Sequence, residues 1–80
     1  MIYVITPHLS DYMNVCRDKD FETKRRSRDN FAEWISSPIQ FMGRRITEVD
    51  QIIYGYRYAE FPPNMVNKFN IEIAVRSPRK

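Results

Sequence analysis

The chain is poor in the residues on which several kinds of site depend. Its 80 residues include two glycines, one cysteine and one histidine. The single cysteine, Cys16, cannot form an intrachain disulfide, and it excludes a metal site made of paired cysteines. We interpret Cys16 as a small core residue on the apolar face of a helix. Without a disulfide pair, the composition favours a reducing compartment, and we expect a cytoplasmic protein.

Long hydrophobic runs are also missing. No segment approaches the roughly 20 apolar residues that cross a membrane as a helix. The first ten residues, MIYVITPHLS, contain no lysine or arginine of the kind that opens a signal peptide. The apolar content of 42% is nevertheless high enough for one compact core. These features predict a single domain over residues 1–80 without membrane contact.

The two glycines, Gly43 and Gly55, are too few and too far apart for a glycine-rich phosphate loop. Such a loop places several backbone amides around phosphate and continues into a lysine and a serine or threonine. Here the first apolar run is followed by PHLSDYM, which has neither glycine nor lysine. The HExxH, GxSxG and GxGxxG patterns are absent from the chain. The sequence therefore excludes an active nucleotide hydrolase of the P-loop type.

The remaining residues of catalytic type are isolated. His8 lies near Ser10 and Asp11, but proximity in sequence does not make a catalytic triad, and we interpret Ser10 as a helix cap and His8 as a surface residue. Glu48 and Asp50 could bind a divalent cation, yet a hard cation takes about six oxygen ligands and no others cluster nearby. We expect no enzyme activity, no cofactor and no metal site.

The first half of the chain predicts a strand, a helix and a second strand. MIYVIT is an apolar, β-branched run typical of a buried strand. Residues 8–19 place Leu9, Met13 and Cys16 at helical spacing, and we expect this face to lie on the sheet. Either Thr6 or Ser10 would cap this helix. FAEWIS then predicts a short second strand.

The second half predicts a short helix, a third strand and a final helix. Ser37 and Pro38 begin a helix of one or two turns over PIQFMGR. EVDQIIYGY is the third strand, and its continuous apolar centre indicates a strand covered on both faces. Residues 64–76 fit a helix capped by Asn64 or, by alternation of their apolar residues, an edge strand; we favour the helix.

This order of elements predicts the fold class. Strands that alternate with helices indicate parallel pairing through crossover connections. We expect a small Rossmann-like α/β domain, with a three-stranded, mainly parallel sheet and flanking helices in the order β-α-β-α-β-α. Residues 18–30, DKDFETKRRSRDN, show no sustained period and are predicted to form a mobile basic loop.

Two features predict recognition of a partner. The net charge of +3 is mild, but cations gather in KRRSR and in the Arg44–Arg45 pair. YGYRYAEF places tyrosines beside an arginine, and both residue types are enriched in interface hot spots. If this run stays extended, Tyr54, Tyr56 and Tyr58 share one face. The predicted partner-binding residues are Lys24, Arg25, Arg26, Arg28, Arg44, Arg45, Tyr56, Arg57 and Tyr58.

The segments IYVIT, WISSP, MGRR and VDQIIYGY together resemble small phage-encoded accessory proteins with a minimal, degenerate P-loop-NTPase-like core. The resemblance implies a non-enzymatic inhibitor or modulator that takes part in host takeover. It would act in the bacterial cytoplasm. The basic segments would suit an acidic patch on a larger host protein, such as RNA polymerase or other nucleic-acid-processing machinery, and we expect the chain to bind and modulate such a protein. The acid expected at the end of the third strand is replaced by Tyr54, Gly55 and Tyr56, so the resemblance does not extend to hydrolysis.

Two alternatives remain open. The basic segments could bind nucleic acid directly, and such binding would weaken steeply with salt. The open end of the sheet could retain nucleotide without hydrolysing it, with Gly55 permitting close approach. The aromatic residues and the modest net charge favour a protein partner, because dedicated nucleic-acid-binding domains are usually more basic.

Overall fold

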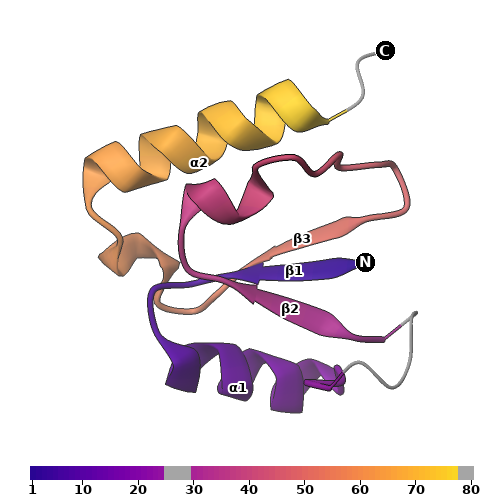
Figure 1. Cartoon of the computed structure of the whole chain (residues 1–80). Helices are drawn as coiled ribbons and strands as arrows, with labels where there is room; N and C mark the ends of the chain where they lie inside the picture. The colour runs from indigo at the N-terminus through magenta and orange to yellow at the C-terminus, as the bar shows by residue number, and fades with distance from the viewer. Residues whose placement is uncertain (25–29, 78–80) are drawn as a thin grey trace.

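The computed structural model describes residues 1–24 and 30–77. It is an α/β domain in which a three-stranded parallel sheet lies between two layers of helix (Figure 1). The strands are β1 (Ile2–Ile5), β2 (Ala32–Ile35) and β3 (Gln51–Tyr54), and their order in the sheet is β2-β1-β3. Both neighbours run parallel to β1. The predicted α/β class and the parallel pairing are therefore confirmed.

Strand β1 is central because all four of its residues are apolar and can be covered on both faces. Its register pairs Ile2 with Ala32 on one side and with Gln51 on the other. Helix α1 (Leu9–Lys19) covers one face, where Ile2 and Val4 pack in a cluster with α1 residues. That cluster consists of Ile2, Val4, Tyr12, Val15, Cys16 and Ala32.

The opposite face is covered by the 3-10 helix η1 (Pro38–Phe41) and helix α2 (Pro63–Arg76), with a short 3-10 helix η2 (Tyr58–Glu60) leading into α2 (Figure 1). Its cluster consists of Tyr3, Ile5, Ile35, Phe41, Ile46, Phe61 and Phe69. The connection from β1 to β2 thus lies on one face and that from β2 to β3 on the other. In open parallel sheets such a reversal places a crevice at the carboxyl ends of the strands.

The tail forms the predicted helix and not the edge strand. Phe69 is fully buried, with ring centroids 6.4 Å from Phe41 and 5.0 Å from Phe61. Pro63 is its first residue, where the missing N–H costs nothing. The predicted cap is wrong, because Pro62 precedes the helix and Asn64 lies within its first turn. The predicted helix over PIQFMGR is a single 3-10 turn from Pro38, preceded by Ser37 as expected.

Of the three α1 residues predicted to face the sheet, Cys16 is buried as expected, whereas Leu9 and Met13 are not. Leu9 and Met13 are 52% and 48% exposed, whereas the buried residues are Asp11, Tyr12, Val15 and Cys16. The buried apolar stripe is Tyr12, Val15 and Cys16, at i, i+3 and i+4, and Asp11 is hydrogen-bonded on the buried side of the helix. The predicted caps are also wrong. His8 occupies the N-cap position, and the Thr6 hydroxyl donates to Asp11 instead.

Strand β3 is shorter and more exposed than predicted. It spans Gln51–Tyr54, and Ile52 and Ile53 are only half-buried. Ile52 packs against one core cluster and Ile53 against the other, so both faces of β3 are covered in part, as predicted. Strand β3 is an edge strand, whereas β1 has neighbouring strands on both sides and is buried throughout.

The predicted loop over residues 18–30 is also shorter at its start. Residues 18 and 19 belong to α1, Phe21 packs against the core, and Glu22 forms a β-bridge with Phe31. Residues 25–29 lie outside the described part of the chain, so the mobility predicted for them stays a prediction.

Candidate binding surfaces

The carboxyl ends of β1 and β3 are joined by a buried carboxylate. Asp11 is 2% exposed, and its Oδ2 accepts a hydrogen bond from Thr6 Oγ1 at 2.6 Å and one from the Arg57 amide at 2.9 Å. Gly55 lies against the same group: a Cβ added there would meet Asp11 Oδ2 and would lie 2.7 Å from the Thr6 Cβ. Gly55 therefore allows its own backbone to lie close to Asp11 and Thr6 of the same chain.

This arrangement changes what the crevice can hold. In nucleotide-binding sheets the first turn of the helix after β1 meets a phosphate. Here that turn carries Asp11, whose charge interacts favourably with the positive end of α1. A phosphate brought to this place would meet a carboxylate already bound by two donors, so the geometry opposes the predicted alternative of nucleotide binding.

An exposed ion-pair cluster borders this carboxylate. Glu60 accepts hydrogen bonds from both Arg57 Nε and Arg57 Nη2, and it also lies 2.8 Å from His8 Nε2. These bonds, with that from Arg57 foremost, hold the pKa of Glu60 below its ordinary value. The cluster links η2 to the N-terminus of α1, so Arg57 is occupied within the molecule.

The predicted basic residues lie only in part within the described residues. Lys24 and Arg45 are exposed, while Arg25, Arg26 and Arg28 lie outside the described residues. Arg44 is bound at 2.7 Å to Glu33, and this hydrogen bond raises the pKa of its guanidinium. Among the five described arginines, four pair with carboxylates, namely Arg17, Arg44, Arg57 and Arg76. Internal pairing thus occupies most of the described arginines, whereas Lys19, Lys24, Arg45 and Lys68 form no ion pair among the described residues.

The predicted tyrosine face does not form either, because the chain leaves the extended conformation after Tyr54. Tyr58 lies in η2 and packs on the core, 5.6 Å from the Phe61 ring. Tyr56 is 61% exposed, and its hydroxyl donates to Asp18 on α1 at 3.0 Å. Tyr54 is 47% exposed, with its ring 4.7 Å from that of Tyr58. Tyr54 and Tyr58 therefore contact each other, whereas Tyr56 is hydrogen-bonded to α1.

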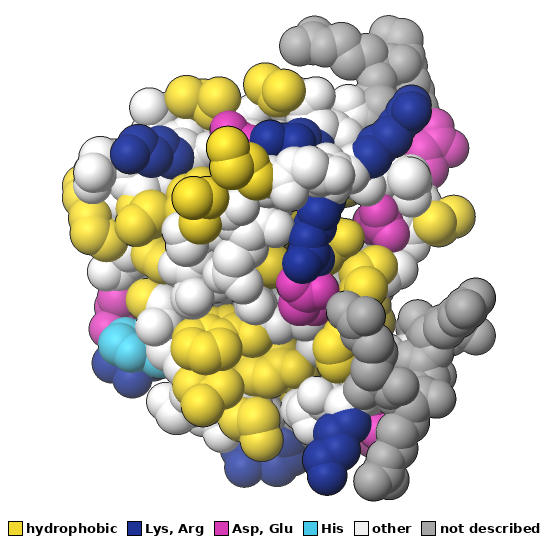
Figure 2. Space-filling model, viewed as in Figure 1, with side chains coloured by type: hydrophobic (Ala, Val, Ile, Leu, Met, Phe, Trp, Pro, Cys, Tyr) yellow, Lys and Arg dark blue, Asp and Glu magenta, His cyan; other side chains and the backbone are white. Residues whose placement is uncertain are grey.

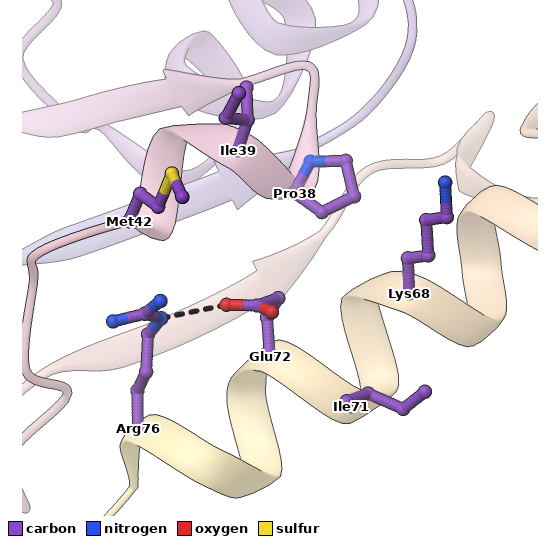
Figure 3. A pocket seen from close by; sticks show the side chains of 7 residues that line it. All are labelled: Pro38, Ile39, Met42, Lys68, Ile71, Glu72 and Arg76. Atoms are coloured by element: carbon purple, nitrogen blue, oxygen red, sulfur yellow. Dashed lines mark hydrogen bonds and ion pairs between the residues drawn. The ribbon is translucent and has the colours of Figure 1, made fainter.

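A groove that the sequence reasoning missed lies between η1 and α2 (Figure 3). Its volume is about 340 Å³. Pro38, Ile39 and Met42 line one side, and Lys68, Ile71, Glu72 and Arg76 line the other. We call it the η1–α2 groove. Figure 2 shows hydrophobic side chains over these two elements with charged side chains among them.

The apolar side chains of the η1–α2 groove are unusually exposed. Ile39 and Met42 are 67% and 68% exposed, and Ile71 is 50% exposed. Val75, one turn beyond Ile71 on α2, is 68% exposed. The short predicted helix could have indicated this exposure. When one turn buries Phe41, the adjacent apolar side chains Ile39 and Met42 point to solvent. Ile71 and Val75 also lie off the stripe that carries Phe69.

Comparison with known proteins does not identify the chain. No protein-family model matches it, and neither curated proteins nor solved structures gave a significant match. Within residues 1–24 and 30–77, no helix has the length and apolar character that crossing a membrane requires. In the same residues, no three His, Cys, Asp or Glu side chains form a group that could hold a metal ion.

Proposed function

We propose that the chain is a non-enzymatic protein-binding domain, a minimal Rossmann-like unit that docks on a larger protein through the η1–α2 groove. The observation that carries this proposal is the convergence of exposed aliphatic side chains on one hollow. Contiguous exposed apolar surface on a small domain is typical of an interaction site. The aliphatic side chains that line it are Ile39, Met42 and Ile71, between 50% and 68% exposed, and the exposed Val75 lies one turn beyond Ile71 on α2.

The charges around the groove define the partner. Arg76 is compensated by Glu72, whose Oε1 lies 2.8 Å from Arg76 Nε (Figure 3). Lys68 forms no ion pair among the described residues and leaves one uncompensated positive charge on the lining. A complementary segment carries two or three apolar side chains and an acidic residue for Lys68. Such a segment would insert as an amphipathic helix does into an apolar groove.

A protein partner is better supported than nucleic acid. Direct phosphate binding needs several free cations, because each contact replaces a counterion. Most described arginines are already bound to carboxylates, as shown above. In the setting implied by the resemblance to phage accessory proteins, we propose that the partner is a host cytoplasmic protein whose activity is modulated by docking.

Selection from a displayed library of short random peptides tests the groove directly. We expect enriched peptides to combine aliphatic side chains with at least one Asp or Glu. Ile39→Asp and Ile71→Asp should each reduce their binding by at least about tenfold, because a charge enters the apolar lining. Val49→Asp is the matched control, since Val49 is 85% exposed and lies outside the groove.

Two results contradict the proposal. One is enrichment of peptides that bind Ile39→Asp, Ile71→Asp and the unaltered chain equally well. The other is failure to enrich any peptide together with tight binding to a single-stranded DNA or RNA oligonucleotide. In the second case, affinity that falls steeply with salt would establish nucleic-acid binding instead.

A further inference from the structure

The two edges of the sheet differ in how their main-chain groups are used. In a parallel ladder, alternate residues turn both their N–H and C=O toward the same neighbouring strand. On β2 the outward residues are Ala32 and Trp34, because the Ile35 carbonyl accepts from Thr6 of the β1 side. Ala32 and Trp34 together have four outward main-chain N–H and C=O groups, and three of these form hydrogen bonds within the chain. Glu22 O accepts from Ala32 N at 2.9 Å, Tyr12 donates to Ala32 O, and Gln40 donates to Trp34 O at 3.2 Å.

The outer edge of β3 has no such cover. Gln51 N and Gly55 N donate to β1, which directs the main-chain groups of Ile52 and Tyr54 away from the sheet. Within the described residues, no hydrogen bond reaches these outward groups, and β1 is the only strand that pairs with β3. The segment Gln51–Tyr54 contains no charge and no proline, the residues by which edges are usually protected from pairing.

We propose that β3 pairs antiparallel with β3 of a second copy of this chain, about a twofold axis at Ile53. The sequence around Ile53 allows the strands of two copies to pair with each other. A twofold axis there places Ile52 opposite Tyr54 of the second copy, so that the outward N–H and C=O groups on both strands bond each other. The result is a continuous six-stranded sheet.

The side chains also fit this pairing. Ile52 and Tyr54 lie on one face, where β-branched and aromatic cross-strand pairs are favourable. Ile53 lies on the α1 face and meets Ile53 of the second copy. Helix α1 contacts β1 and β2, which leaves Ile53 half-buried in a single copy. Pairing would bury the apolar surface that the fold leaves open.

Charge does not oppose the twofold arrangement. Gln51–Tyr54 is uncharged, so the axis brings no like charges together within the strand. Asp50, just before the strand, is bound at 3.1 Å to the Met1 ammonium of its own chain. None of the residues that line the η1–α2 groove belongs to β3, so this interaction is separate from the proposed function.

A single cysteine at the axis tests the register. A non-hydrogen-bonded antiparallel pair has Cα atoms about 4.5 Å apart, within the range that a disulfide spans. Ile53→Cys should therefore form a covalent dimer on mild oxidation. Gln51→Cys is the control on the same strand, because antiparallel pairing at Ile53 separates the two copies of residue 51 by roughly 14 Å. Native Cys16 is 1% exposed, and burial raises the pKa of its thiol, so it should not react.

Sedimentation equilibrium tests the association without a new cysteine. The unaltered chain should show a mass that rises with concentration from 9.7 kDa toward twice that value. Tyr54→Pro should remain monomeric and folded by circular dichroism, because it removes an outward N–H that the monomer does not use. A chain that stays monomeric at its highest soluble concentration overturns the proposal. So does equal cross-linking of Gln51→Cys and Ile53→Cys.

Discussion

Single residues explain why a glycine and a tyrosine follow the third strand. A metal-binding acid is not what this position requires, because Asp11 already brings a carboxylate to it from α1. The Asp11 carboxylate and the Thr6 side chain lie against Gly55 and leave no space for a side chain there. Beyond it, Tyr56 reaches α1 through its hydrogen bond to Asp18. The Gly-Tyr ending thus closes the carboxyl end of the sheet.

The first prediction concerns Gly55. In Gly55→Ala the new Cβ overlaps Asp11 Oδ2 and lies 2.7 Å from the Thr6 Cβ. We expect a loss of about 1–3 kcal/mol in the free energy of unfolding, as for overpacking elsewhere. Thermal unfolding followed by circular dichroism measures it, since 1 kcal/mol corresponds to roughly 4–8 °C in a domain of this size.

Gly43→Ala provides the comparison. Gly43 has a φ of +74°, but no atom lies within 4 Å of an added Cβ. Its substitution should therefore cost only the backbone strain of about 1 kcal/mol. If Gly55→Ala is as stable as the unaltered chain, the contact with Asp11 does not constrain this position.

At the scale of elements, η1 depends on one side chain. Gln40 Oε1 accepts from the amides of Ser36 and Ser37 at 2.7 and 2.9 Å, and its Nε2 donates to Trp34 O at 3.2 Å. These bonds connect η1 to the end of β2 and set the position of Ile39 in the η1–α2 groove. A single 3-10 turn has too few internal hydrogen bonds to hold this position alone.

The second prediction follows for Gln40→Ala. Loss of its acceptor leaves two amides unpaired, at a cost of about 1–3 kcal/mol. Hydrogen exchange should show faster exchange of the Ser36 and Ser37 amides, while amides of α1 change only as far as global stability falls. Gln51→Ala is the matched control, because the Gln51 side chain is exposed and makes no described hydrogen bond. Unchanged exchange at Ser36 and Ser37 would contradict the role given to Gln40.

The elements also show which features of the fold can be predicted from short-range sequence patterns. The buried strand β1 and the final helix α2 could be predicted, because a continuous apolar run and a helical stripe are local signals. The buried face of α1 could be predicted only in part, since the pattern also allowed Leu9 and Met13, and packing against β1 and β2 buries Tyr12 and Val15 instead. The η1–α2 groove could not be predicted either, because the burial of Ile39 and Ile71 depends on how η1 and α2 pack together.

At the scale of the whole molecule, buried tyrosine links stability to alkaline pH. Burial, aided by the nearby Cys16 thiol, raises the pKa of Tyr12 to about 12, and its hydroxyl donates to Ala32 O at 2.5 Å. Unfolding exposes this hydroxyl and returns it to a pKa of about 10. The unfolded chain therefore releases the proton first. The stabilisation is complete below about pH 10 and is lost as pH rises toward 12.

The third prediction is that Tyr12→Phe flattens this alkaline loss. The unaltered chain should lose up to about 3 kcal/mol between pH 10 and 12 through Tyr12. Urea unfolding at a series of pH values should show a smaller decline for Tyr12→Phe, from a slightly lower stability at neutral pH because Ala32 O loses its donor. Parallel curves for Tyr12→Phe and the unaltered chain would contradict this link.

The sequence by itself determined the α/β class, the parallel order of elements and the absence of a phosphate-binding loop. These follow from composition, short-range periodicity and the positions of two glycines, all of which are local properties. Only the tertiary structure decided which strand is central, which face of α1 is buried, that most described arginines are paired, and where apolar side chains remain exposed. Each of these depends on contacts between residues far apart in the chain, such as Asp11 with Arg57 and Phe41 with Phe69. A linear pattern carries no information on the packing partner that occupies each face.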